Sequence, residues 1–225
     1  PNQIAALYNF PFADAALWQA VQTGAIGLVE PGVGSAVPGS ATFDELLAAY
    51  RGDAGITTAL PPTITVAGGG QAYDPDSASE RSLDVGIITA VNPNSQLVVY
   101  AGSGSANNAG SDSFTAYQSA IWDTVNNIGV LSSSDKSYPN VSAGSPFLFA
   151  LEELFVDAAL RNITVVNSVG DGGSGNQYAN GLTNVSAMHA TPFAIAVGGT
   201  SISTYEIAGE DVTLRSKFYD KALDG

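Results

Sequence analysis

The chain has 225 residues, of which 45% are hydrophobic and 12% charged, and its 21 acidic and 7 basic residues give a formal net charge of −14. A chain of this length and composition can bury a substantial core, which excludes an intrinsically disordered protein. The excess of acidic residues argues against nucleic acid and anionic membranes as partners, since both are bound by Lys and Arg. The absence of cysteine excludes disulfides and thiolate metal sites. No run of about 18 apolar residues predicts a membrane span.

Apolar runs that end at Gly, Pro or Asn alternate along the chain with segments of helical spacing. The chain should begin with a helical turn over 1–11 and a loop or short helix over 12–23, in which Trp18 packs inward. We expect strands over 25–30, 63–67, 96–101, 128–134, 163–167 and 193–197. Between them we expect helices over 42–50, from 80 to the stop at 92–94, over 113–125 and over 146–160, and the tail 200–225 should form a hairpin. This alternation predicts an α/β fold with a parallel sheet and helices on both faces.

Two carboxylates lie one turn apart in the helix that begins near residue 80. Glu80 and Asp84 are four residues apart and therefore share one face of that helix. If both side chains are drawn inward, one of them must hold a proton well above its ordinary pKa, which would suit proton transfer at acid pH. The alternative is a solvated helix N-terminus, where acidic residues are favoured by the helix dipole.

Polar residues follow the predicted strands at the edge where parallel sheets bind ligands. These residues are Glu30, Gly68–Gly70, Ser132–Ser134 and Ser168–Asp171. Glu30 ends a buried strand and should meet a partner, either nearby amides or a carboxylate cluster. Asp171 lies among glycines, so it is either a turn former or, when protonated, a hydrogen-bond donor to an oxyanion.

Two other residues invite a catalytic interpretation that their surroundings do not favour. His189 is the single histidine and has no specific Asp or Ser arrangement near it in the sequence, so we interpret it as a loop or wall residue. Ser201 follows a strand and precedes another extended run, so no helix N-terminus would activate it. The sequence contains no metal-ligand cluster, and its glycine-rich loops lack a phosphate-loop Lys.

Four motifs occur in the order of the sedolisin family, the serine-carboxyl peptidases with a subtilisin-like fold. They are the strand and Gly-rich turn at 25–34, the Glu80-x-x-x-Asp84 helix, the Ser168-Val-Gly-Asp171 strand end and the segment 190–200. The chain resembles this family over nearly all of its 225 residues. The resemblance implies a subtilisin-like parallel sheet with helices on both faces.

The resemblance also implies a role for each site residue. Glu80 would be the general base for a nucleophilic serine, Asp84 would orient Glu80 and share its proton, and protonated Asp171 would be the oxyanion donor. Glu30 would extend this proton network, and Ser132, Ser133 and Ser134 would flank the substrate backbone. A family Trp after the Ser-rich strand is replaced by Asp135, which bears on the network around Glu30.

The family's Ser-Gly-Thr-Ser stretch, which carries the nucleophile, does not occur in residues 1–225. We therefore expect these residues to form the N-terminal portion of a single peptidase domain, whose nucleophile and calcium site lie in a remainder of the enzyme, possibly a separate cleaved chain. The implied protein is an acid-acting endopeptidase made as a proenzyme, acting on polypeptides, and secreted or held in an acidic lysosome-like compartment. The alternatives are a non-catalytic subtilisin-like binding or scaffold protein and an unrelated α/β ligand-binding domain.

Overall fold

The structure is a computed structural model that describes residues 8–10, 15–20, 23–31, 41–59, 61–66, 75–102, 109–134, 144–169 and 191–199. For residues 15–16, 75–80 and 109–112 it describes the backbone alone. The expectations for the helical turn within 1–7 and for the hairpin in 200–225 lie outside the described residues.

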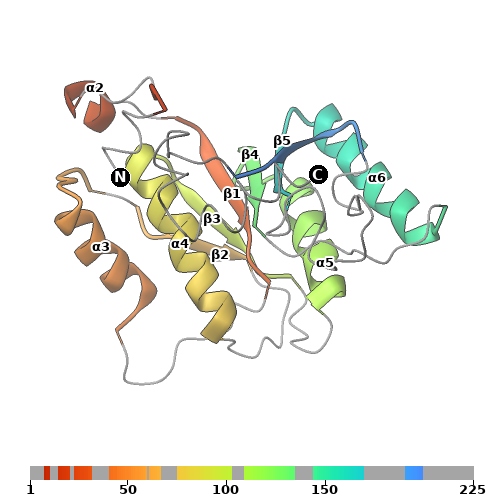
Figure 1. Ribbon diagram of the computed structural model, residues 1–225, viewed down its shortest axis with the longest axis horizontal. Coiled ribbons are helices and arrows are strands. Elements are labelled where there is room, and N and C mark those ends of the chain that lie inside the picture. Colours follow the sequence, from red (N-terminus) through yellow and green to blue (C-terminus); the bar gives the residue numbers. More distant parts are fainter. Residues whose placement is uncertain are drawn as a thin grey trace, which may run out of the picture.

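Six strands form one sheet in the order β2-β3-β1-β4-β5-β6, and every neighbouring pair is parallel (Figure 1). The strands are β1 (Ala25–Val29), β2 (Ile64–Val66), β3 (Leu97–Tyr100), β4 (Ile128–Ser133), β5 (Thr164–Ser168) and β6 (Ala194–Val197). All six strands predicted from the sequence are confirmed, with ends that differ by at most a few residues. Because β1 lies between β3 and β4, the carboxyl ends of these three strands meet at the centre of one edge.

The described helices are α2 (Ala15–Ala20), α3 (Phe43–Asp53), α4 (Pro75–Val91), α5 (Ala109–Ile121) and α6 (Pro146–Leu160). The predicted capping box is present at α3, where the Thr42 hydroxyl accepts from the Glu45 amide and the Glu45 carboxylate accepts from the Thr42 amide. Ser145 caps α6, with Pro146 at the first helical position, where a missing N–H is tolerated. None of the described helices is long and apolar enough to cross a membrane.

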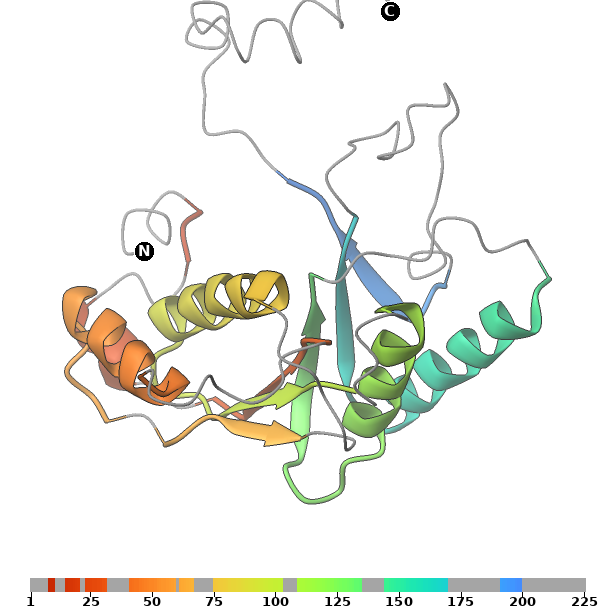
Figure 2. The same cartoon turned by 90° about the horizontal axis from the view of Figure 1, so that it is seen from below.

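Helices cover both faces of the sheet, as the alternation of elements predicts. Figure 2 shows α3 and α4 on one side of the strands and α5 and α6 on the other. The α5–α6 side buries the larger cluster, which includes Tyr117, Leu131 and Phe155. The α3–α4 side buries a smaller cluster around Leu28 and Val99. The core therefore consists of two layers separated by the parallel strands.

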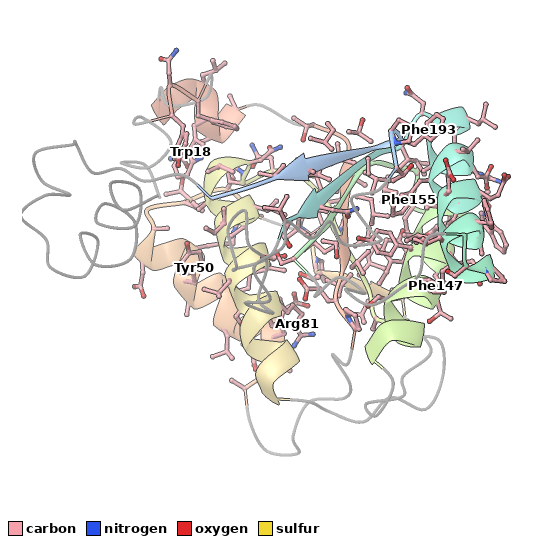
Figure 3. All side chains as sticks on the ribbon, turned by 45° about the vertical axis from the view of Figure 1, so that its right-hand side comes forward. Trp18, Tyr50, Arg81, Phe147, Phe155 and Phe193 are labelled. Carbon is pink, nitrogen blue, oxygen red and sulfur yellow. The ribbon has the colours of Figure 1, made fainter. Side chains whose placement is uncertain are left out.

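Trp18 packs inward from α2, as expected (Figure 3). Its side chain is buried and its indole N–H donates to the carbonyl of Ala90 at 2.6 Å. This bond satisfies the polar atom of a buried aromatic ring and ties α2 to the last turn of α4.

Two helices differ from the prediction in their bounds. The helix α4 begins at Pro75, before the expected start near residue 80. Residues 75–79 have no large apolar side chain, so apolar periodicity could not predict this first turn. The helix α5 spans Ala109–Ile121 instead of 113–125, so Val125 lies beyond the helix end and is exposed. Two of the apolar residues at helical spacing in α4, Leu83 and Ile87, are also exposed, whereas Val85 forms the buried contact.

A buried guanidinium joins α3 to the end of α4. Arg51 donates to the Thr89 hydroxyl at 2.5 Å, to the Pro93 carbonyl at 2.8 Å and to the Thr58 carbonyl at 2.7 Å. Burial lowers the pKa of the Arg51 guanidinium from its ordinary value. Neutral acceptors, which also include the Thr58 hydroxyl at 3.4 Å, therefore hold this positive charge between α3 and α4, the helix that carries Asp84.

Replacing Arg51 by Met should lower the free energy of unfolding by about 2–3 kcal/mol, because buried acceptors lose a charged donor. The matched control is Arg161→Met, which removes an exposed guanidinium bonded to Asp157 and should cost about 0.5 kcal/mol or less. Urea unfolding of both variants measures the difference. Equal decreases in the free energy of unfolding would show that the buried contacts of Arg51 stabilise the protein no more than the exposed ion pair of Arg161.

Candidate active site

The ends of two strands and the middle of a helix bring Glu30, Asp84 and Ser134 together at the carboxyl edge of the sheet. Glu30 directly follows β1, and its amide donates to the carbonyl of Tyr100 at 2.9 Å, which fixes its backbone against β3. Its side chain is only 3% exposed. Asp84 comes from α4 and Ser134 directly follows β4, the strand on the other side of β1. The site is therefore built from the central strand and the helix that packs above it.

The Ser134 hydroxyl lies within hydrogen-bond distance of both carboxyl oxygens of Asp84, at 2.9 Å from Oδ1 and 2.7 Å from Oδ2. A hydroxyl carries one proton and can donate it to only one of these oxygens at a time. It can accept from the other oxygen when Asp84 is protonated. The contact thus suits both protonation states of the carboxyl.

Burial raises the pKa of Asp84 above its ordinary value of 3.8, and hydrogen bonds with Ser134 and Glu30 partly offset this rise. A hydrogen bond between two carboxyls needs a proton on one of them, since two carboxylates at this distance repel each other. A bond between the carboxyls of Glu30 and Asp84 therefore forms only when one of them is protonated. The role expected for Glu30 stays a prediction.

The other two acidic residues of the predicted site are described less fully. Glu80 lies in α4, one turn before Asp84, where its backbone places it on the same helix face. Asp171 lies outside the described residues, three positions after the end of β5 at Ser168. The glycines 68–70, His189 and Ser201 are also outside the described residues. The roles predicted for Glu80 and Asp171 thus stay predictions.

The three serines that follow one another at the end of β4 do not face the same way. Ser133 is buried on the α5–α6 side of the sheet, whereas Ser132 pairs with Leu28 on the α4 side. The side chain of Ser134 contacts Asp84, a contact that the sequence analysis did not predict. The alternation of side chains along a strand could have signalled that Ser132 and Ser134 share the α4 side.

A second buried polar pair lies at the same edge and was not predicted. The hydroxyl of Tyr117 in α5 donates to Oδ1 of Asn167 at 2.6 Å, and both side chains are almost completely buried. Asn167 is the second-last residue of β5 and pairs with Ser133 in β4 and with Ala196 in β6. The bond anchors the end of β5, four residues before Asp171, to the helix beneath it.

The described residues include no group of three or more His, Cys, Asp or Glu side chains that could hold a metal ion. The cluster of Glu30, Asp84 and Ser134 contains two carboxyls and a hydroxyl, groups that can exchange protons with one another.

No family model matches the chain. Kumamolisin from Bacillus sp. (strain MN-32) is 27% identical to it over 208 residues, which cover 90% of this chain and 34% of that protein. The chain is a homologue of kumamolisin. The matched region is long enough to include the predicted Glu-x-x-x-Asp helix, which carries Asp84. The homology therefore argues against the alternative of an unrelated α/β ligand-binding domain.

The solved structure of Pseudomonas sedolisin, a serine-carboxyl proteinase complexed with two molecules of pseudo-iodotyrostatin, has the same fold. The TM-score is 0.65 with 21% sequence identity, and the match covers 91% of this chain and 54% of that one. The predicted subtilisin-like α/β fold is therefore confirmed. The chain spans about a third of kumamolisin and about half of the sedolisin chain.

Replacing Ser134 by Ala should raise the pKa of Asp84 further, because the substitution removes a hydrogen bond that favours the charged carboxylate. Carboxyl carbon NMR titration of Asp84 measures the shift. Ser132→Ala is the matched control, since it deletes a hydroxyl from the same side of the same strand without touching Asp84. An unchanged Asp84 titration in Ser134→Ala would contradict the proposed contact.

The raised pKa of Asp84 makes the protein less stable as pH rises. Between the ordinary value of 3.8 and the higher folded-state value, the folded state binds more protons than the unfolded state, so the free energy of unfolding falls with increasing pH. The variant Asp84→Asn should lose this fall, while Asp53→Asn, at an exposed site in α3, should keep it. Urea unfolding across this pH range compares the three proteins, and parallel curves for wild type and Asp84→Asn would refute the assignment.

Proposed function

We propose that this chain is part of an acid-acting serine-carboxyl endopeptidase. The observation that carries the proposal is the half-buried Asp84, held by the carboxyl of Glu30 and the hydroxyl of Ser134 at the carboxyl edge of a subtilisin-like sheet. The sequence relationship to kumamolisin supports the same conclusion. A carboxyl whose pKa is raised can exchange a proton at acid pH, where ordinary carboxylates begin to titrate.

In the proposed reaction, Glu80 accepts the proton of a serine hydroxyl as the serine oxygen attacks the peptide carbonyl. Asp84 orients Glu80 and shares its proton, and Glu30 extends this exchange into the buried edge. The developing oxyanion accepts a hydrogen bond from protonated Asp171. Glu80 then gives the proton to the leaving amine, and a water molecule hydrolyses the acyl-enzyme by the same steps.

The substrate backbone would bind beyond the end of β4 as an added strand, flanked by Ser132–Ser134. The contact between the Ser134 hydroxyl and Asp84 favours a role for the backbone of Ser134, rather than its side chain, in holding the peptide. Polypeptide binding would in this way be adjacent to the carboxyl cluster.

The nucleophilic serine would lie in a part of the enzyme outside these 225 residues, either in the same chain or in a separate cleaved chain. The implied calcium would bind there too, and it takes part in none of the proposed steps. Secretion, or an acidic lysosome-like compartment, and synthesis as a proenzyme fit an enzyme with 21 acidic and 7 basic residues in this portion. A non-catalytic scaffold protein is not favoured by the homology.

The variant Glu80→Gln of the protein expressed from its complete gene should cleave an unfolded polypeptide at acid pH about 10²–10⁴-fold more slowly, because the general base is lost. Circular dichroism should show an unchanged fold. The matched control is Glu153→Gln, which alters an exposed carboxylate of α6 on the opposite side of the sheet and should retain full activity.

Unchanged turnover in Glu80→Gln would defeat the assignment of the base. Equal losses in Glu80→Gln and Glu153→Gln would show a general effect of charge rather than catalysis.

A further inference from the structure

A polar contact lies inside the larger apolar cluster, on the α5–α6 side of the sheet. Tyr117 is completely buried, and its hydroxyl donates to Oδ1 of Asn167, which is 2% exposed. The ring of Tyr117 packs edge-on against Phe155 of α6, with ring centroids 5.2 Å apart. Replacing both partners of a buried hydrogen bond by apolar groups of the same shape can be nearly neutral for stability. A gain in stability is therefore a weak reason for this pair to be polar.

Asn167 lies where the paired part of β5 ends. It is the second-last residue of that strand and pairs with Ser133 of β4, which directly precedes Ser134 of the carboxyl cluster. The amide of Val169 donates to the carbonyl of Val197 at 3.0 Å, so hydrogen bonding to β6 continues one residue beyond the strand. The Tyr117 hydroxyl therefore holds the end of β5 from the helix side, while the neighbouring strands hold its backbone.

The chain that follows β5 offers few side chains that could fix Asp171. The residues on either side of Asp171, at positions 170 and 172, are glycines, which have no side chain to pack. Of the last three described residues before this segment, Asn167 is buried, Ser168 is partly exposed and Val169 is 37% exposed. The last buried side chain before Asp171 in the described part of the chain is thus that of Asn167.

We propose that Tyr117 and Asn167 are positioning residues for the oxyanion donor. Tyr117, fixed by the packing of α5, holds the end of β5 through Asn167 and thereby sets the place of Asp171. The inference rests on the proposed function, in which protonated Asp171 donates to the oxyanion. The pair acts through the backbone, so neither side chain needs to touch the substrate. Because a small misplacement of a donor weakens a hydrogen bond formed only in the transition state, the pair should affect kcat and leave KM unchanged.

The variant Tyr117→Phe, made in the protein expressed from its complete gene, removes one hydroxyl and keeps the ring packed against Phe155. With a labelled unfolded polypeptide at acid pH, kcat should fall about 10–100-fold while KM stays within about twofold. The matched control is Tyr100→Phe. Tyr100 is completely buried in the same cluster, but its hydroxyl donates to Asp123, which lies between α5 and the start of β4 at the opposite edge of the sheet. This control should keep its kcat.

A double-mutant cycle shows whether Tyr117 acts through Asp171. The single variant Asp171→Ala should lower kcat about 10²–10³-fold, because an oxyanion donor is lost. Adding Tyr117→Phe to it should cause no further loss, because the group that Tyr117 positions is already absent. A further loss as large as that of Tyr117→Phe alone would overturn the proposal. Wild-type kcat in Tyr117→Phe, or equal decreases in Tyr117→Phe and Tyr100→Phe, would overturn it too.

The titration of Asp84 provides a second measurement on Tyr117→Phe. Carboxyl carbon NMR should show the same Asp84 pKa as in the wild type, because Ser134 and Asp84 meet on the other side of the sheet. A shifted Asp84 pKa together with the loss of kcat would show that Tyr117 acts on the carboxyl cluster instead, and would overturn the proposal. Full activity of Asp171→Ala would remove the proposed oxyanion donor and the inference with it. Full activity of Tyr117→Phe beside an impaired Asp171→Ala would remove the inference alone.

Discussion

The contact of the Asp84 carboxyl with the Ser134 hydroxyl, beside the buried Glu30, is the constraint on which the described site depends. Neighbouring carboxylates repel each other, so a hydrogen bond between Glu30 and Asp84 forms only when one of them is protonated. The fold enforces the contact because Glu30 is held by the sheet backbone and Asp84 by a helix packed on the same sheet. Ser134 completes the cluster with a hydroxyl that serves either protonation state.

The strand order explains why these residues can meet although they are far apart in the sequence. The strand β1 lies between β3 and β4 in the sheet, and β1 and β4 are parallel neighbours. Glu30 and Ser134, which follow these two strands, therefore lie at the same edge. The helix α4 runs above them and contributes its carboxyl face to that edge. The same arrangement leaves β4, β5 and β6 uncovered on the side next to Asp84 among the described residues.

The sequence predicted elements whose signals are local. The strands are apolar runs ended by Gly, Pro or Asn, and α3 and α6 begin at Thr42 and Ser145, whose side chains cap the first turn. Contacts between distant residues were harder to predict. The pairing of Tyr117 with Asn167, and of Ser134 with Asp84, requires the strand order and the alternation along each strand. Apolar periodicity likewise placed Ile87 in a helix but could not predict that its side chain is exposed among the described residues.

The way Arg51 is held affects how the framework behaves in acid. Proteins unfold at low pH largely because carboxylates that are paired with cations in the native state become protonated and release them. The guanidinium of Arg51 donates to two hydroxyls and two carbonyl groups, none of which titrates in this range. Within the described part of the chain, the one ion pair joins Arg161 to Asp157 at the surface. The contacts of Arg51 between α3 and α4 can therefore keep their geometry while the carboxyl of Asp84 changes charge. Acidification would then alter the chemistry of the site without loosening the helices that support it.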